Sequence, residues 1–161
     1  MAAVDYFLKI DGIKGESQDA KHAGEIELQS WSWGETNSGS FAQSAGGGAG
    51  KVVMQDFHFV MTSNTASPKL FQACASGEHI ANAVLTCRKA GKDQQEFLII
   101  KFADLLISSY QTGGSQGDVI PTDQISFNFA GIEIDYKEQK ADGSLGPAIH
   151  GGWDVKKHQK K

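Results

Sequence analysis

The sequence predicts a mainly-β fold: a small β-barrel of antiparallel strands, with one flanking α-helix and a long, extended, glycine-rich loop. The chain has 161 residues with 19 glycines and only three prolines, a composition that favours many turns over disorder. Short apolar segments recur between turn signals at steady spacing, which is typical of a barrel or a sandwich. Two strands change the phase of their apolar residues, and bulges of this kind let a small closed barrel turn its corners.

The first two strands are predicted from apolar alternation. Tyr6–Ile10 is a short apolar run that ends at the turn signal Asp11-Gly12. Glu25–Trp33 has apolar residues in two phases, Ile26 and Leu28 and then Trp31 and Trp33. Because successive side chains of a strand point to opposite faces, this segment contains a bulge or buries different faces at its two ends.

A long loop from Glu35 to Lys51 follows, rich in glycine, serine and alanine. Hairpin loops normally have about 2–5 residues, and a longer loop in a compact domain is usually functional or disordered. After it, Val53–Met61 is predicted as one long strand with both faces partly apolar. The loop therefore forms an arm that leaves the β-fold, and it is the first candidate for a functional segment.

One helix is predicted, over Lys69–Ser76. Ser67 can cap its free N–H groups, Pro68 suits the first helical position, and Gly77 suits a left-handed stop. We expect the helix to pack on the sheet through an apolar stripe, formed by Leu70, Phe71 and Cys74.

The second half of the chain reads as strands again. The segments are Ala83–Lys89, Glu96–Phe102, Leu105–Gln111 after a kink near Asp104, the alternating run from Ile125 to Tyr136, and Gly151–Val155. The phase change in the run from Ile125 predicts a second bulge at Gly131. We expect one domain over residues 1–155 and a mobile basic tail over residues 156–161.

Composition excludes several classes of function. The net charge is −4 with both signs interspersed, which argues against nucleic acid as a partner. No apolar stretch approaches the ~20 residues of a membrane span, and the first residues lack the basic region of a signal peptide. The two cysteines and five histidines form no ligand cluster, so we expect no metal and no cofactor.

Three motifs that suggest catalysis are better explained structurally. Gly46–Lys51 resembles a phosphate loop, but it opens a strand and not a helix. Gly113–Gly117 matches a nucleophile pattern around Ser115, but no helix follows, so a hairpin loop is favoured over a hydrolase. Cys74 and His79 flank the helix end, where a buried thiol and a surface imidazole are favoured over a catalytic pair. The chain is not expected to be an enzyme.

The order of several short motifs resembles the haemolysin-coregulated protein (Hcp) family, the tube proteins of the bacterial type VI secretion system. The resemblance runs in one collinear order from about Ala3 to Trp153. Its motifs are Tyr6–Ile10, Gly15-Glu16-Ser17, Trp31-Ser32-Trp33-Gly34, Gly46–Val52, Cys74–Gly77, Arg88–Gly91 and Gln139–Gly143.

The resemblance implies a tail-tube-like barrel whose subunits form homohexameric rings, with rings stacked into a hollow tube inside a contractile sheath. It implies sheath, tip (spike) and effector proteins as partners, with effectors carried in the lumen or on the tip. The subunit would be made in the cytoplasm and then secreted by this system without a cleavable signal peptide.

Two sets of candidate site residues follow from combining the resemblance with the residues. Closed rings and open stacks both use head-to-tail contacts, and a long arm can reach a neighbour. The candidates for ring or ring-to-ring contact are Asn37, Ser38, Gly39, Ser40, Phe41, Gln43, Gly46, Gly47, Gly48 and Gly50. Ser32 lies between two tryptophans; if these face the core, Ser32 faces the opposite side, which we predict to be the lumen that holds cargo.

A monomeric small-ligand-binding β-barrel is the alternative function. It requires an apolar cavity inside the barrel, whereas four phenylalanines can fill that interior instead: Phe57, Phe59, Phe127 and Phe129.

Overall fold

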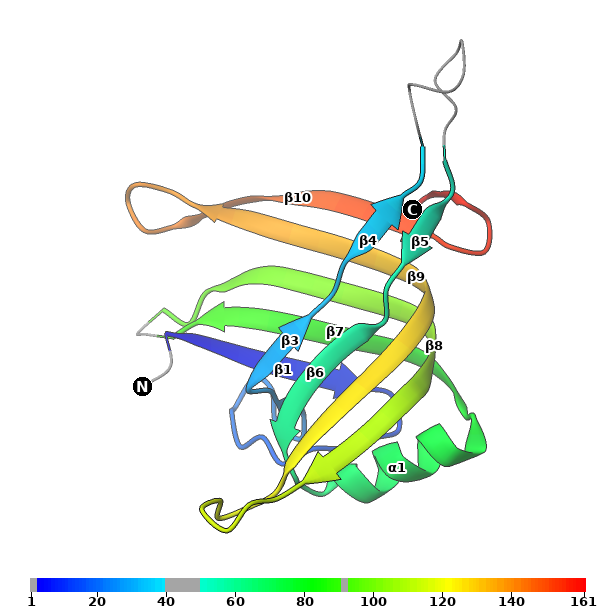
Figure 1. The fold of residues 1–161 in the computed structure, drawn as a ribbon. Coiled ribbons are helices and arrows are strands. Elements are labelled where there is room, and N and C mark those ends of the chain that lie inside the picture. The colour runs from blue at the N-terminus through cyan, green and yellow to red at the C-terminus, as the bar shows by residue number, and fades with distance from the viewer. Residues whose placement is uncertain (1–2, 40–49, 91–92) are drawn as a thin grey trace.

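The computed structural model describes residues 3–39, 50–90 and 93–161, and it is mainly antiparallel β with one helix, as predicted. Figure 1 shows the strands wrapped around a common interior, with the helix at one side and a narrow ribbon projecting from the body. The elements are β1 (Val4–Ile10), β2 (Ile26–Glu27), β3 (Ser30–Ser32), β4 (Glu35–Asn37), β5 (Val52–Met54), β6 (Phe57–Thr62), α1 (Ala66–Ser76), β7 (His79–Lys89), β8 (Glu96–Gly113), β9 (Thr122–Gln139), β10 (Leu145–Asp154) and β11 (Gln159–Lys160).

The main sheet curls back on itself. Its strands run in the order β2-β1-β7-β8-β9, and the far edge of β9 pairs with β6, which in turn pairs with β3. Two consecutive residues between β2 and β3 join the ends of this series. The N–H of Leu28 donates to the carbonyl of Tyr6 on β1 (3.0 Å), and the N–H of Gln29 donates to that of Val60 on β6 (2.8 Å). The segment Ile26–Ser32, which contains β2 and β3, therefore connects β1 to β6.

The interior of the curled sheet is filled by aromatic side chains. Phe57, Phe59, Phe102 and Phe127 are each at most 1% exposed. The ring centroids of Phe57, Phe102 and Phe127 lie 4.9–5.1 Å apart in all three pairs. Full burial of one such side chain stabilises the fold by about 1.5–3 kcal/mol, so this cluster is a major part of the core.

Helix α1 ends as predicted but begins differently. Gly77 has φ +67° and its N–H donates to the carbonyl of Ala73, which confirms the left-handed stop. The Ser67 cap is wrong: the side-chain oxygen of Asn64 accepts from the N–H of Ala66 (2.8 Å) instead. The predicted stripe is right for Leu70, which is buried, and for Cys74, which packs against the core, but it is wrong for Phe71, which is 59% exposed.

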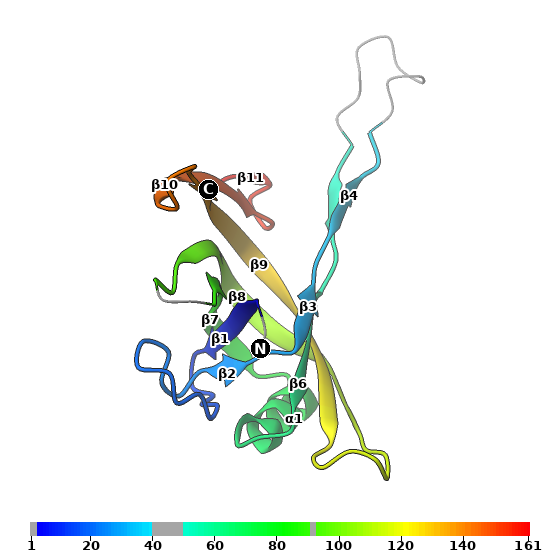
Figure 2. The same ribbon diagram turned by 90° about the vertical axis from the view of Figure 1, so that its left-hand side faces the viewer.

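Two segments predicted as single strands are each split. Glu25–Trp33 becomes β2 and β3, because its two ends pair with β1 and β6 respectively. Val53–Met61 becomes β5 and β6, and β5 leaves the main sheet to pair with β4. The arm is therefore a paired ribbon at its base and not a structureless loop from Glu35 onward, as Figure 2 shows in a second view.

The predicted kink at Asp104 is confirmed, and the predicted bulge at Gly131 is wrong. Asp104 has φ +54°, yet β8 continues through it as one strand. Pairing is in register across Gly131 with both β8 and β10, and the register shift lies at Ser108 in β8. The phase change near Gly131 coincides with the point where the edge of β9 exchanges β6 for β10.

The basic tail is folded, contrary to the expectation of a mobile terminus. Lys160 pairs with Trp153, and the N–H of Lys161 donates to the carbonyl of Gly152 (3.1 Å). The strand predicted over Gly151–Val155 is also longer than expected, since it corresponds to β10, which begins at Leu145. Across the described residues, no helix is long and apolar enough to cross a membrane.

Candidate functional site

Ser32 occupies one end of a row of polar residues that crosses four neighbouring strands. It pairs with His58 on β6, which pairs with Ser126 on β9, which pairs with Ser109 on β8. Directly paired residues share a face of a sheet, so these four side chains point to the same side. The Ser126 hydroxyl and His58 Nδ1 lie 2.5 Å apart, which links two members of the row.

The tryptophans that flank Ser32 pack against the core. The Trp31 ring stacks near Phe57 with a centroid distance of 6.0 Å, and Trp33 lies 6.2 Å from Phe129. Ser32 itself is exposed. Its side chain is therefore on the face opposite the core, as the alternation of strand side chains requires.

The face that carries Ser32 is polar and almost free of charge. In the part of this side nearest Ser32, formed by β3, β6, residues 122–128 of β9 and residues 106–113 of β8, there is no lysine, arginine, aspartate or glutamate. The positions are Ser30, Ser32, His58, Val60, Thr62, Thr122, Gln124, Ser126, Asn128, Leu106, Ser108, Ser109, Gln111 and Gly113. Asp56 lies just before β6, and it accepts a hydrogen bond from Ser108 (2.5 Å). This face can form hydrogen bonds with a partner without selecting strongly for its charge.

The arm is the second candidate site, and its described part is a ribbon of β4 and β5. Asn37 braces its far end: its amide donates to the carbonyl of Gly50 (3.0 Å), and its oxygen accepts from the N–H of Gly39 (2.8 Å). A Cβ on Gly50 would lie 2.0 Å from the Gly39 nitrogen, so the two sides of the ribbon approach too closely for any other residue at position 50. Ser38 is exposed beside them.

Six of the arm candidates, Ser40, Phe41, Gln43, Gly46, Gly47 and Gly48, lie outside the described residues. In the described part of the arm, Val53 on β5 is 59% exposed. The described ribbon thus offers an apolar side chain and open backbone edges to a neighbour, where it projects from the curled sheet (Figures 1 and 2).

The catalytic interpretations find no support in the geometry. The Ser115 hydroxyl donates to Asp118 (2.9 Å) in an exposed turn that leads into β9, and not into a helix. His79 bonds to Asp104 (3.0 Å), while Cys74 packs against the core. No group of three metal-ligating side chains occurs within the described parts of the chain.

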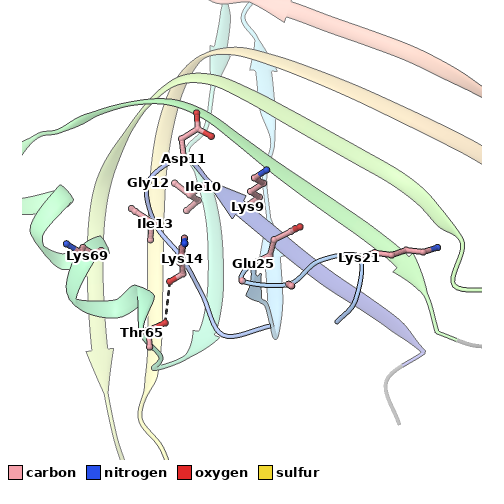
Figure 3. Close-up of a pocket in the computed structure, with 12 residues that line it drawn as sticks. Lys9, Ile10, Asp11, Gly12, Ile13, Lys14, Lys21, Glu25, Thr65 and Lys69 are labelled. Carbon is pink, nitrogen blue, oxygen red and sulfur yellow. Dashed lines mark hydrogen bonds between the residues drawn. The ribbon is translucent and has the colours of Figure 1, made fainter. Parts of the chain in front are cut away.

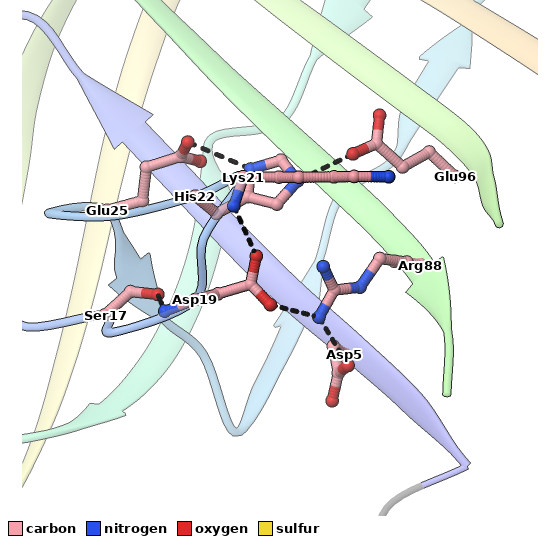
Figure 4. Close-up of polar contacts among 8 residues, drawn as sticks. All are labelled: Asp5, Ser17, Asp19, Lys21, His22, Glu25, Arg88 and Glu96. Atoms are coloured by element: carbon pink, nitrogen blue, oxygen red, sulfur yellow. Dashed lines mark hydrogen bonds and ion pairs between the residues drawn. The ribbon is translucent and has the colours of Figure 1, made fainter. Parts of the chain in front are cut away.

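Sequence reasoning missed a charged cluster around His22, which is buried at 7% exposure. Its two ring nitrogens lie 2.9 Å from Glu25 and 2.7 Å from Glu96 (Figure 4). Beside it, the buried Arg88 guanidinium donates to Asp19 (2.7 Å) and to Asp5 (3.2 Å). Glu25 is three residues from His22, but Glu96 and Arg88 come from distant parts of the sequence, so no local spacing signalled the cluster.

A groove lies between the segment that carries this cluster and helix α1 (Figure 3). Four lysines line it, Lys9, Lys14, Lys21 and Lys69, together with Asp11 and Glu25. The Thr65 hydroxyl donates to the carbonyl of Lys14 (3.4 Å) and connects the two walls.

Comparisons with known proteins place this curled sheet, flanking helix and projecting ribbon among secretion proteins. Residues 7–136 match the family model described as "Type VI secretion system effector, Hcp". Protein hcp1 of Pseudomonas aeruginosa is 46% identical over 158 residues, which are 97% of this chain and 98% of the relative. The chain therefore belongs to the Hcp family.

Solved structures agree. Hcp1 from Salmonella typhimurium has a TM-score of 0.83 at 35% identity, covering 99% of this chain and 100% of that one. A type VI secretion system effector from Yersinia pestis has a TM-score of 0.75 at 33% identity, covering 94% and 100%. The chain is accordingly a secreted component of the type VI secretion tube and an effector carrier, in a family of structural proteins and not of enzymes.

Proposed function

We propose that this chain assembles as a hexameric ring, that rings stack into a hollow tube, and that effectors are carried in the lumen. The sheath and the tip proteins of the secretion machine are its further partners. The subunit is made in the cytoplasm and is exported by this system without a cleavable signal peptide.

One observation carries this proposal: among the residues that the structure describes, β4 and β5 pair only with each other. The described pairing is three residues long, Glu35–Asn37 against Val52–Met54. An isolated two-stranded hairpin is marginally stable at best in water. The exposed Val53 on this ribbon therefore fits a surface that a neighbouring subunit covers, either within the ring or in the next ring.

The interior of the barrel favours this function over binding of a small ligand. A ligand-binding barrel would require an open apolar cavity in this interior. Phe57, Phe59 and Phe127 fill the interior instead, each at no more than 1% exposure. The polar face around Ser32 lies on the other side of the same strands. We assign this face to the lumen, where small hydroxyl and amide side chains meet the cargo.

A matched pair of substitutions tests the arm. Val53→Asp places a charge on the ribbon and is expected to shift rings toward monomers. Val119→Asp, at an exposed position of the 114–121 loop, is expected to leave ring assembly unchanged. Equal assembly of both variants and the parent protein would exclude the arm as a contact surface.

A second pair tests the lumen. Ser32→Gln is expected to keep the ring intact and to reduce the amount of effector that co-purifies with it, because a larger side chain fills the contact face. Ser115→Gln, in an exposed loop, serves as the control. A Ser32→Gln ring that still assembles and holds its effector normally would exclude the luminal assignment.

A further inference from the structure

His22 connects a long surface segment to the barrel, and both of its ring nitrogens face carboxylates. Nδ1 lies 2.9 Å from Glu25, three residues further along the same segment, and Nε2 lies 2.7 Å from Glu96 at the start of β8. The imidazole is nearly parallel to the ring of Phe7 on β1, with a centroid distance of 4.4 Å and an angle of 9°. Figure 4 shows the ring held between the two acids.

The two contacts can both be hydrogen bonds only when His22 is protonated. An ionised carboxylate accepts hydrogen bonds, and a neutral imidazole carries one N–H, so it can satisfy only one of the two acids. Burial lowers the pKa of His22, but the hydrogen bonds to Glu25 and Glu96 raise it by more, so the pKa lies above its ordinary value.

Four other charged groups lie around the ring. They are Asp19 and Lys21 on the same segment, Asp5 on β1, and Arg88 on β7, whose guanidinium lies 4.8 Å from the centre of the Phe7 ring. Arg88 ties the segment to the sheet through Asp19 at all moderate pH values. Of these contacts, the one through His22 is the one that depends on a proton in the neutral range.

The segment itself is held together by a few backbone hydrogen bonds. The N–H of Gly15 donates to Gly24 (2.8 Å), that of Gly24 to Ser17 (2.9 Å), and that of Ser17 to Glu25 (3.0 Å). Lys14, Lys21 and Glu25 of the same segment form one wall of the lysine-lined groove in Figure 3. Movement of the segment would therefore change the shape of that groove.

We propose that His22 is a proton-dependent clamp, which fastens residues 14–25 to β8 and thereby sets the shape of the groove beside helix α1. When His22 loses its proton, one carboxylate faces a ring nitrogen without hydrogen, and the segment loosens from the sheet. The clamp is formed within one subunit by the cluster around His22 and does not require ring assembly.

Amide hydrogen exchange followed by NMR, together with the titration of the His22 ring, tests the clamp. After correction for intrinsic exchange, protection of the Gly15, Ser17 and Gly24 amides is expected to fall as the pH rises through the His22 pKa. The expected fall is about tenfold, which corresponds to the loss of one hydrogen bond to a charged group. Unchanged protection across that titration would overturn the proposal.

Variants separate the clamp from general effects of pH. His22→Gln is expected to remove the pH dependence of exchange in this segment, and a dependence that survives would overturn the proposal. Glu96→Gln is expected to move the transition to lower pH, and it carries the test if His22→Gln does not fold. His150→Gln is the matched control, because His150 also contacts an acid, Asp135 (2.8 Å), but lies exposed on β10.

Discussion

The hydroxyl of Ser67, in the first turn of helix α1, donates to the carboxylate of Asp123 on β9 across 2.5 Å. Asp123 is fully buried, and two more hydroxyls donate to it, those of Ser63 (2.7 Å) and Tyr110 (3.2 Å). The serine that was predicted to cap the helix instead fastens the helix to the barrel. This buried acid is thus the junction between α1, β8 and β9.

We expect Asp123→Asn to destabilise the protein by about 1.5–3 kcal/mol, because hydroxyl donors then lose a charged acceptor. Burial raises the pKa of Asp123, but the hydrogen bonds, led by that from Ser67, lower it by more. A group whose pKa is lowered by folding stabilises the fold at pH values above its pKa in the unfolded chain. This contribution therefore disappears as the pH falls through the pKa of the folded state. Urea unfolding at neutral and acid pH measures both effects. Asp118→Asn, at an exposed acid with one hydroxyl partner, is the control and should change stability little.

The pair of Arg88 and Asp19 predicts a second loss of stability in acid. The hydrogen bond from Arg88 holds the pKa of Asp19 at about 2. The stabilising effect is therefore present at neutral pH and is lost as the pH falls from about 4 toward 2. Asp19→Asn is expected to lower the thermal midpoint at pH 7 and to have little effect near pH 2. An equal effect at both pH values would show that the carboxylate charge is unimportant.

Gly77 predicts a backbone effect at the end of helix α1. Its φ of +67° suits glycine, and a Cβ there would meet nothing within 4 Å. Gly77→Ala should therefore cost about 1–2 kcal/mol from backbone strain alone. Gly117 has equally open surroundings but no positive φ, so Gly117→Ala is a matched control. Equal unfolding midpoints for the two variants would contradict this explanation.

The strands that alternate cleanly could be predicted from the sequence, because one buried face imposes a period of two. Phe57, Phe59 and Phe127 identified the core in this way, and Asp104 marked the kink in β8. The split of Glu25–Trp33 could not be predicted, because it depends on two partners, β1 and β6, that are distant in sequence.

The candidate sites also differ in whether the sequence could predict them. The exposure of Ser32 followed from the alternation of its neighbours, and the projecting arm followed from the length of the loop, although the pairing at the base of the arm was not predicted. The clusters around His22 and Asp123 were missed, since each depends on a contact across more than 50 residues of sequence, from His22 to Glu96 and from Ser67 to Asp123. The basic tail was misjudged because its pairing with β10 is made mainly by backbone groups, which leave no pattern in side chains.

The native mass of the purified protein, measured by light scattering on a sizing column and paired with negative-stain images, tests the central claim most directly. We expect a hexamer that appears as rings with an open pore, and a shift toward monomers in Val53→Asp. A monomer at every protein concentration, with no rings in the images, would contradict it.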